Sequence, residues 1–329
     1  MQVNRHFSLK FVFLMPLVIA LVVLALTIKN YYDSVNRDIN DEYERINAAL
    51  SRAAKVISAL DYSFSNYSKS NYILLVEHNR QIKDDLCQMW PIDAALLSDG
   101  RHQEIPAVDI SYMLVGDVSL CDPSSADYQR VSGQVSLAPV LSFLHDIDSY
   151  LLGIHYIDKE GYIMSSPDTY AKSITLELLQ TIKARPFWHQ TAHNRDLVTL
   201  TGPAPIATTS DLVMSMTMPV FNKGIHQGML SVDISYDELL DSQGKLAGNL
   251  SIIDSARISP PDNALRFETI DIDGVVGEHS LYYLFDLPKE IGNFFSFERN
   301  SLIVTLFIYV FSVIVLFFIN TRVEHGYFK

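Results

Sequence analysis

Two uninterrupted apolar runs, one near each end, constrain most strongly what this chain can fold into. Residues 11–28 and 302–319 are each 18 residues long and contain no charged side chain. At about 1.5 Å per residue, a helix of that length with its flanking residues crosses a hydrocarbon core of roughly 30 Å. A cleaved signal peptide, the alternative for the first run, usually has a shorter apolar core of about 7–15 residues. We therefore predict two transmembrane helices, at residues 11–29 and 300–320.

The short tails predict the orientation of these helices. Residues 1–10 carry Arg5 and Lys10 without an acid, and residues 321–329 carry Arg322 and Lys329 against one acid. Basic tails of this kind stay on the cytoplasmic side of a membrane. We expect a two-pass protein of the bacterial inner membrane, with both termini cytoplasmic and its main domain periplasmic.

The segment between the two helices is strongly acidic. It holds 21 basic and 37 acidic residues, and it has no electrostatic basis for binding nucleic acid. Neither a G-x-S-x-G nor an H-E-x-x-H motif occurs in the chain, and it has no Walker-type glycine loop. His189 and His193 are four residues apart but have no third ligand at a fixed spacing. We predict no catalytic site, no cofactor and no metal.

Cys87 and Cys121 are the only cysteines, and both lie in the predicted periplasmic segment. An oxidising compartment permits a disulfide between them, which is the pairing we expect. Two buried thiols are the alternative.

A long helix is predicted after the first apolar run, because neither proline nor glycine occurs from residue 30 to residue 90. Apolar side chains recur there at spacings of three and four, which is a heptad pattern. This seam could pack on its own domain or on the same helix of a second copy in a homodimer. Its members are Ile39, Tyr43, Ile46, Leu50, Ala53, Ile57, Leu60 and Phe64.

Beyond residue 150 the pattern changes to one that favours an antiparallel sheet. Strand-like runs occupy residues 152–157, 162–165, 212–220 and 227–234, with Gly161 and Gly224 in the turns and a short helix at 174–184. Three further short strands, at residues 249–254, 265–273 and 280–286, predict a small membrane-proximal β subdomain. The prediction is an α+β fold, with a main domain at residues 30–248 and the subdomain at 249–299.

This order of elements resembles the extracytoplasmic Cache (PAS-like) sensor domains of bacterial receptors. The likeness covers about residues 35–245 and is carried by four short segments. They are IDKEGYI at 157–163, RPFW at 185–188, MPVF at 218–221 and GMLSVDI at 228–234. The resemblance implies a domain that binds a small molecule and passes a signal through the two membrane helices.

The chain is also similar to membrane-anchored diguanylate cyclases that carry such a sensor. In those proteins a cysteine pair precedes the sheet, and a Leu-Pro segment like YYLFDLP at 282–288 precedes the second membrane helix. Here only residues 321–329 follow that helix, without a GGDEF-like signature. We expect the sensor part of a transducer whose output lies outside this chain. A membrane partner or assembly protein that works without a small ligand is the alternative.

Four residues are candidates for ligand binding in such a domain. In amino-acid-binding Cache domains an arginine, nearby aromatic residues and a later aspartate hold the ligand, and the resemblance places these roles on Arg185, Phe187, Trp188 and Asp233. A guanidinium forms a fork for a carboxylate, and a carboxylate accepts hydrogen bonds from an ammonium. The expected ligand is an amino acid, an amine or a carboxylate. In the alternative interpretation the aromatic residues belong to the core and Asp233 caps a strand.

Overall fold

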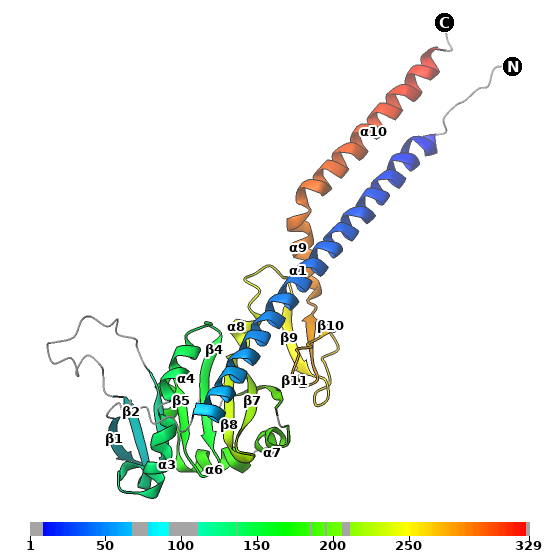
Figure 1. Ribbon diagram of the computed structural model, residues 1–329. Helices are drawn as coiled ribbons and strands as arrows, with labels where there is room; N and C mark the ends of the chain where they lie inside the picture. The colour runs from blue at the N-terminus through cyan, green and yellow to red at the C-terminus, as the bar shows by residue number, and fades with distance from the viewer. Residues whose placement is uncertain are drawn as a thin grey trace.

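The computed structural model describes residues 9–67, 78–91, 111–135, 137–184, 186–194, 196–205 and 211–326. It confirms the predicted α+β class, with a long N-terminal helix and an antiparallel sheet (Figure 1). The helices are α1 (Leu9–Tyr67), the 3-10 turn η1 (Val118–Cys121), α3 (Ala126–Val135), α4 (Ala138–His145), α5 (Asp168–Lys172), α6 (Leu176–Ala184), α7 (Pro186–His193), α8 (Tyr236–Leu240), α9 (Leu287–Phe297) and α10 (Arg299–Gly326).

The strands of the described residues form two sheets. The larger has the order β1-β2-β3-β5-β4-β8-β7-β6-β11, and the smaller has the order β10-β12-β9. All neighbouring strands are antiparallel except β11 and β6, which are parallel. β11 lies between β10 and β12 in the sequence, so the segment that forms the small sheet also adds a strand to the large sheet. The strands are β1 (His78–Lys83), β2 (Leu86–Pro91), β3 (Met113–Asp117), β4 (Leu151–Asp158), β5 (Ile163–Ser166), β6 (Val198–Pro205), β7 (Leu212–Asn222), β8 (Ile225–Ser235), β9 (Asn249–Asp254), β10 (Ala264–Thr269), β11 (Val275–Val276) and β12 (His279–Leu284).

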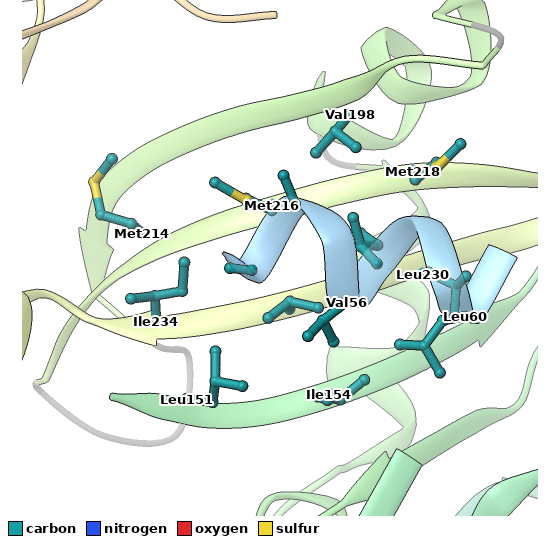
Figure 2. Close-up of a cluster of buried hydrophobic side chains, with 14 of the residues drawn as sticks. Val56, Leu60, Leu151, Ile154, Val198, Met214, Met216, Met218, Leu230 and Ile234 are labelled. Carbon is teal, nitrogen blue, oxygen red and sulfur yellow. The ribbon is translucent and has the colours of Figure 1, made fainter. Parts of the chain in front are cut away.

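The main core lies between α1 and one face of the large sheet. Side chains alternate between the two faces of a strand, so every second residue of β7 and β8 points toward α1. In β7 these are Met214, Met216 and Met218, which lie with Leu230 and Ile234 of β8 around the helix (Figure 2). The other face of the sheet is covered by α5, α6 and α7.

The heptad seam of α1 packs on its own domain. Ile46, Leu50, Ile57 and Leu60 have 0% of their surface exposed, and all belong to the main core. The intrachain interpretation of this seam is therefore correct. Because the seam is already covered, a homodimer would need another surface, and the predicted dimer stays a prediction.

Replacing Ile57 by alanine should lower the free energy of unfolding of the globular part, residues 30–299, by about 3 kcal/mol, because the substitution leaves a cavity in a closed core. Urea unfolding followed by tryptophan fluorescence measures this, since Trp90 and Trp188 both lie in the globular part. Lys55→Ala, at an exposed position of the same helix, is the control and should change stability by less than about 0.5 kcal/mol. An equal, small effect in both variants would contradict the packing of the seam.

The predicted long helix is present, but it does not extend to residue 90. It ends at Tyr67 in the described residues, and 78–91 form the hairpin of β1 and β2 instead of helix. Asp84 and Asp85 make the turn of this hairpin with φ values of 53° and 60°. Aspartate tolerates this left-handed region better than most residues, so the chain reverses there without glycine.

The expected disulfide is present. Cys87 in β2 is bonded to Cys121 at the end of η1, with 5.5 Å between their Cα atoms. The bond connects the edge of the large sheet to the turn that precedes α3.

The two apolar helices extend from the globular part side by side (Figure 1). Both are long and apolar enough to cross a membrane by length and composition, and none of the apolar window of α10 is buried within the chain. Thr27 and Ser301 face each other with 3.4 Å between their hydroxyl oxygens, and Asn30 Nδ2 donates to Glu298 Oε1 over 3.5 Å. The small sheet and α9 lie where these helices meet the globular part (Figure 1). The domain boundaries at residues 248 and 299 stay predictions.

Candidate functional site

The face of the large sheet that points away from α1 is polar at its centre. Ser215 and Thr217 alternate with the core methionines of β7, and Ser231 and Asp233 alternate with the core residues of β8. In the pairing register Ser215 lies opposite Asp233, and Thr217 lies opposite Ser231. Four polar side chains therefore share one face of two adjacent central strands.

A cavity of about 130 Å³ lies between this polar face and the helical layer. Leu178 and Ile182 of α6 and Tyr170 of α5 form part of its wall. Thr191 of α7 ties the helical layer to the sheet, with 2.8 Å between its hydroxyl oxygen and that of Thr217. The lining residues are His155, Ile157, Ile163, Tyr170, Leu178, Ile182, Thr201, Ala204, Pro205, Val213, Ser215, Thr217, Ser231 and Asp233.

Asp233 is the buried carboxylate of this cavity. Its Oδ1 accepts hydrogen bonds from Ser215 Oγ at 2.7 Å and from Ser231 Oγ at 3.1 Å, and its Oδ2 lies 3.4 Å from His155 Nε2. An ionised carboxylate has about four lone-pair sites. The protein occupies three of them, which leaves acceptor capacity for a ligand in the cavity.

The surroundings of Asp233 favour its charged form. Burial alone would raise the pKa of this carboxyl, but the hydrogen bond and the charge of His155, together with the hydroxyls of Ser215 and Ser231, lower the pKa below its usual value. Asp233 is therefore an anion at neutral pH, inside a region that is largely closed to water.

His155 on β4 positions the second oxygen of this carboxylate. The ring is 3% exposed, its Nδ1 lies 2.7 Å from Ser165 Oγ, and the Tyr170 ring packs over it with 4.3 Å between centroids. Nε2 donates to Asp233 Oδ2, and Nδ1 lies against the Ser165 hydroxyl, which itself donates to Pro167 O over 3.3 Å. His155 is held from two sides and can donate to Asp233 in a fixed direction.

Of the four residues predicted from the sequence, Asp233 lines the cavity. Trp188 lies on α7, and its ring makes an edge-to-face contact with the His226 ring, with 5.7 Å between the ring centroids. The same side chain packs against the apolar cluster of the helical layer. Phe187 belongs to the same helix. Arg185 lies outside the described residues. The ligand-binding roles of these residues stay predictions.

The polar partners of Asp233 were missed in the sequence. A signal for one of them, Ser215, exists in Met214-Ser215-Met216-Thr217-Met218, where apolar and hydroxyl side chains alternate strictly. Such alternation marks a strand with two unlike faces. His155 carries no comparable signal, because only the pairing of β4 with β8 brings it near Asp233.

Comparison with known proteins finds similar structures but no related sequence. No protein-family model matches the chain, and no curated protein matches it. The sensory domain of the Campylobacter jejuni chemoreceptor Tlp3 (CcmL) with isoleucine bound is 13% identical with a TM-score of 0.40, over 72% of this chain and 71% of that one. The same domain in a second crystal structure is 11% identical with a TM-score of 0.44, over 83% and 98%. The ligand-binding domain of the Pseudomonas aeruginosa amino acid chemoreceptor PctC with GABA is 11% identical with a TM-score of 0.41, over 77% and 97%.

Proposed function

We propose that this chain is the sensor part of a two-pass transducer in the bacterial inner membrane, and that its periplasmic domain binds a small molecule bearing an ammonium group. The observation that carries the proposal is the buried, charged Asp233 at the wall of a cavity, with unused acceptor capacity. A cationic group gains most from such a carboxylate where water is scarce. A small amino acid or an amine has this group.

The size of the cavity supports a small ligand. An apolar cavity of about 150 Å³ holds benzene, so about 130 Å³ suits a molecule of similar size. Apolar side chains, including Ile157, Ile163 and Leu178, line part of the wall and would contact the aliphatic part of an amino acid. Arg185, Phe187 and Trp188 would bind its other groups, as the resemblance to amino-acid-binding Cache domains implies.

The position of α1 supports a route for the signal. This helix contacts β6, β7 and β8 on the face opposite the cavity, and the same three strands carry Thr201, Ser215 and Asp233. It continues without interruption into the first apolar run, over roughly 90 Å in all. A ligand that changes the spacing of these strands would shift α1 directly, provided that it binds the two arrangements with unequal affinity. The output, which we propose to be of the diguanylate cyclase type, would lie outside this chain.

A ligand screen on the full-length protein in nanodiscs tests the proposal. Amino acids, amines and small carboxylates are added, and the thermal unfolding of the globular part is followed by tryptophan fluorescence. A ligand at 100 times its dissociation constant should stabilise the protein by about 2.7 kcal/mol. We expect at least one compound with an ammonium group to raise the unfolding temperature. If no compound of the panel raises it, the proposal is wrong.

Three variants make the screen specific for the cavity. Asp233→Asn removes the charge, and Ala204→Phe places a ring at an exposed position of the lining and leaves the Asp233 side chain unchanged in sequence. Both should abolish the stabilisation by the ligand. Asp254→Asn, on β9 and outside the lining, is the matched control and should keep it. Stabilisation that survives in the first two variants would place the ligand elsewhere.

A further inference from the structure

A second, larger cavity lies at the base of the globular part, where the two apolar helices begin. It has a volume of about 620 Å³ and is bounded by α1, the small sheet and α9. The wall is mainly apolar or aromatic, with Asn36, Arg266 and Glu290 as its other members, and each of these elements contributes to it. Its apolar lining residues include Val35, Ile39, Phe267, Phe285, Ile291 and Phe294. We call this cavity the basal groove.

The basal groove is continuous with the surface of the apolar helices. Its lining runs along α1 from Ile28, inside the first apolar run, to Ile39. At about 1.5 Å per residue, Ile39 lies about 15 Å beyond Lys29, the last residue of the predicted membrane span. Near the membrane end Ile28 is 51% exposed and Phe295 of α9 is 57% exposed. An apolar surface therefore leads from the first apolar run into the groove.

Two charged residues line the groove: Glu290 keeps an anionic headgroup away from its back, and Arg266, which is exposed on β10, donates to Thr269 Oγ1 at 2.8 Å. Glu290 lies at the back of the groove, 6% exposed, and accepts hydrogen bonds from Tyr31 Oη at 2.9 Å and from Tyr283 Oη. A buried carboxylate repels an anionic headgroup. At the membrane end, by contrast, Lys29 and Arg299 are exposed and can meet a phosphate.

The tyrosines hold the groove in shape. Tyr31 comes from α1, and Tyr283 comes from β12, where its hydroxyl oxygen also accepts from Gly248 N at 2.8 Å. Burial, followed by the hydrogen bond to Glu290, raises the pKa of both tyrosines, so both remain neutral donors. Glu290 of α9 therefore connects α9 to α1 and to β12 behind the apolar wall. These hydrogen bonds fix the positions of the three elements around the groove.

From these observations we propose that the basal groove binds one hydrocarbon chain of a lipid from the outer leaflet of the membrane. The lipid keeps its headgroup near Lys29 and Arg299 and raises one acyl chain between α1 and α9 toward Phe267. The proposal rests on the membrane placement of α1 and α10, which is part of the proposed function, but it does not depend on the ligand of the upper cavity.

Photo-crosslinking of the full-length protein tests this proposal. The protein is placed in vesicles of phosphatidylethanolamine and phosphatidylglycerol that contain a phosphatidylethanolamine with a diazirine at the end of one acyl chain. After irradiation, cross-linked peptides are mapped by mass spectrometry. We expect cross-links in residues 35–39 and 265–267, in addition to those in 302–319. Cross-links in 302–319 without any in the groove would overturn the groove proposal alone, and their absence from both would also overturn the membrane placement.

Variants separate a lipid chain from other occupants. Filling the groove with Val35→Trp and Ile291→Trp should remove the cross-links at 265–267 and keep those in 302–319. Ile258→Trp, at an exposed apolar position outside the groove, is the control and should change neither. Groove cross-links that persist in the filled variant would overturn the proposal. A second copy of the chain in the groove would also overturn it, and would appear as a disulfide-linked dimer of Asn36→Cys together with missing lipid cross-links.

Discussion

Asp233→Ala should lower the free energy of unfolding of the globular part by about 3 kcal/mol. The substitution leaves the hydroxyls of Ser215 and Ser231 and one nitrogen of His155 without their buried acceptor. Each buried donor that loses its partner costs about 1–3 kcal/mol, and breaking a buried charged pair costs about 3–5 kcal/mol. Part of this loss is recovered where water enters the cavity. Urea unfolding of the full-length protein, followed by tryptophan fluorescence, measures the change.

The same carboxylate makes stability depend on pH in a known direction. The pKa of Asp233 is lower in the folded protein than in the unfolded chain, so the unfolded chain binds more protons near pH 4. The stabilisation by Asp233 is therefore complete above about pH 4 and is lost as the pH falls through the lower, folded pKa. In Asp233→Asn this contribution is absent, and the free energy of unfolding should fall less steeply between about pH 5 and pH 3.

Comparing Asp233→Asn with the unchanged protein separates the contribution of Asp233 to the pH dependence from that of the other acidic residues. Hydrogen bonds from Ser119 and Ser124 also lower the pKa values of Asp117 and Asp122, but these carboxyls titrate in the same way in both proteins. Equal pH dependence in both proteins would show that Asp233 is not the charged partner of His155 in the folded state.

The regular parts of the fold were predictable because they follow simple periodicities. The apolar runs, the heptad seam and the alternating strands β4, β7 and β8 each carry a pattern that extends over many residues. β6 was missed because its sequence, VTLTGPAP, contains glycine and proline, which usually end strands. It accommodates them through a register shift between Thr201 and Ala204. β1 was missed because HNRQIK is polar and lies at an exposed sheet edge, where no apolar alternation is required.

The candidate site was predictable only in part, because it depends on strand register. Asp233 was identified through the resemblance to Cache domains, which places a ligand-binding aspartate in the segment GMLSVDI. Its partner Ser215 lies 18 residues away, and His155 lies still farther. Both reach Asp233 through pairings of β7 and β4 with β8, and a shift of one residue would turn Ser215 to the opposite face. Sequence periodicity identifies the faces of each strand but not which residues stand opposite one another.

Replacing both cysteines by serine should lower the free energy of unfolding of the globular part by about 4 kcal/mol. The disulfide closes a loop with a sequence separation of 34 residues, and in the chain-entropy model the closure of such a loop raises the free energy of the unfolded state by about that much. Cys87 is fully buried in β2, and β2 joins the hairpin at the sheet edge to β3. Removing the disulfide should therefore destabilise mainly β1, β2 and β3, at the end of the large sheet that is farthest from the small subdomain.

The comparison of oxidised and reduced protein provides the matched experiment, since it changes the bond without changing the sequence. Urea unfolding with and without a strong reductant should reproduce the difference between the unchanged protein and Cys87→Ser/Cys121→Ser, while the double variant itself should not respond to the reductant. Trp90, three residues after Cys87 on the same strand, reports on this edge of the sheet. A loss below about 1 kcal/mol would mean that the unfolded chain is already compact in this region without the bond. A loss of the expected size together with unchanged ligand binding would show that the disulfide stabilises the sheet edge without shaping the cavity at Asp233.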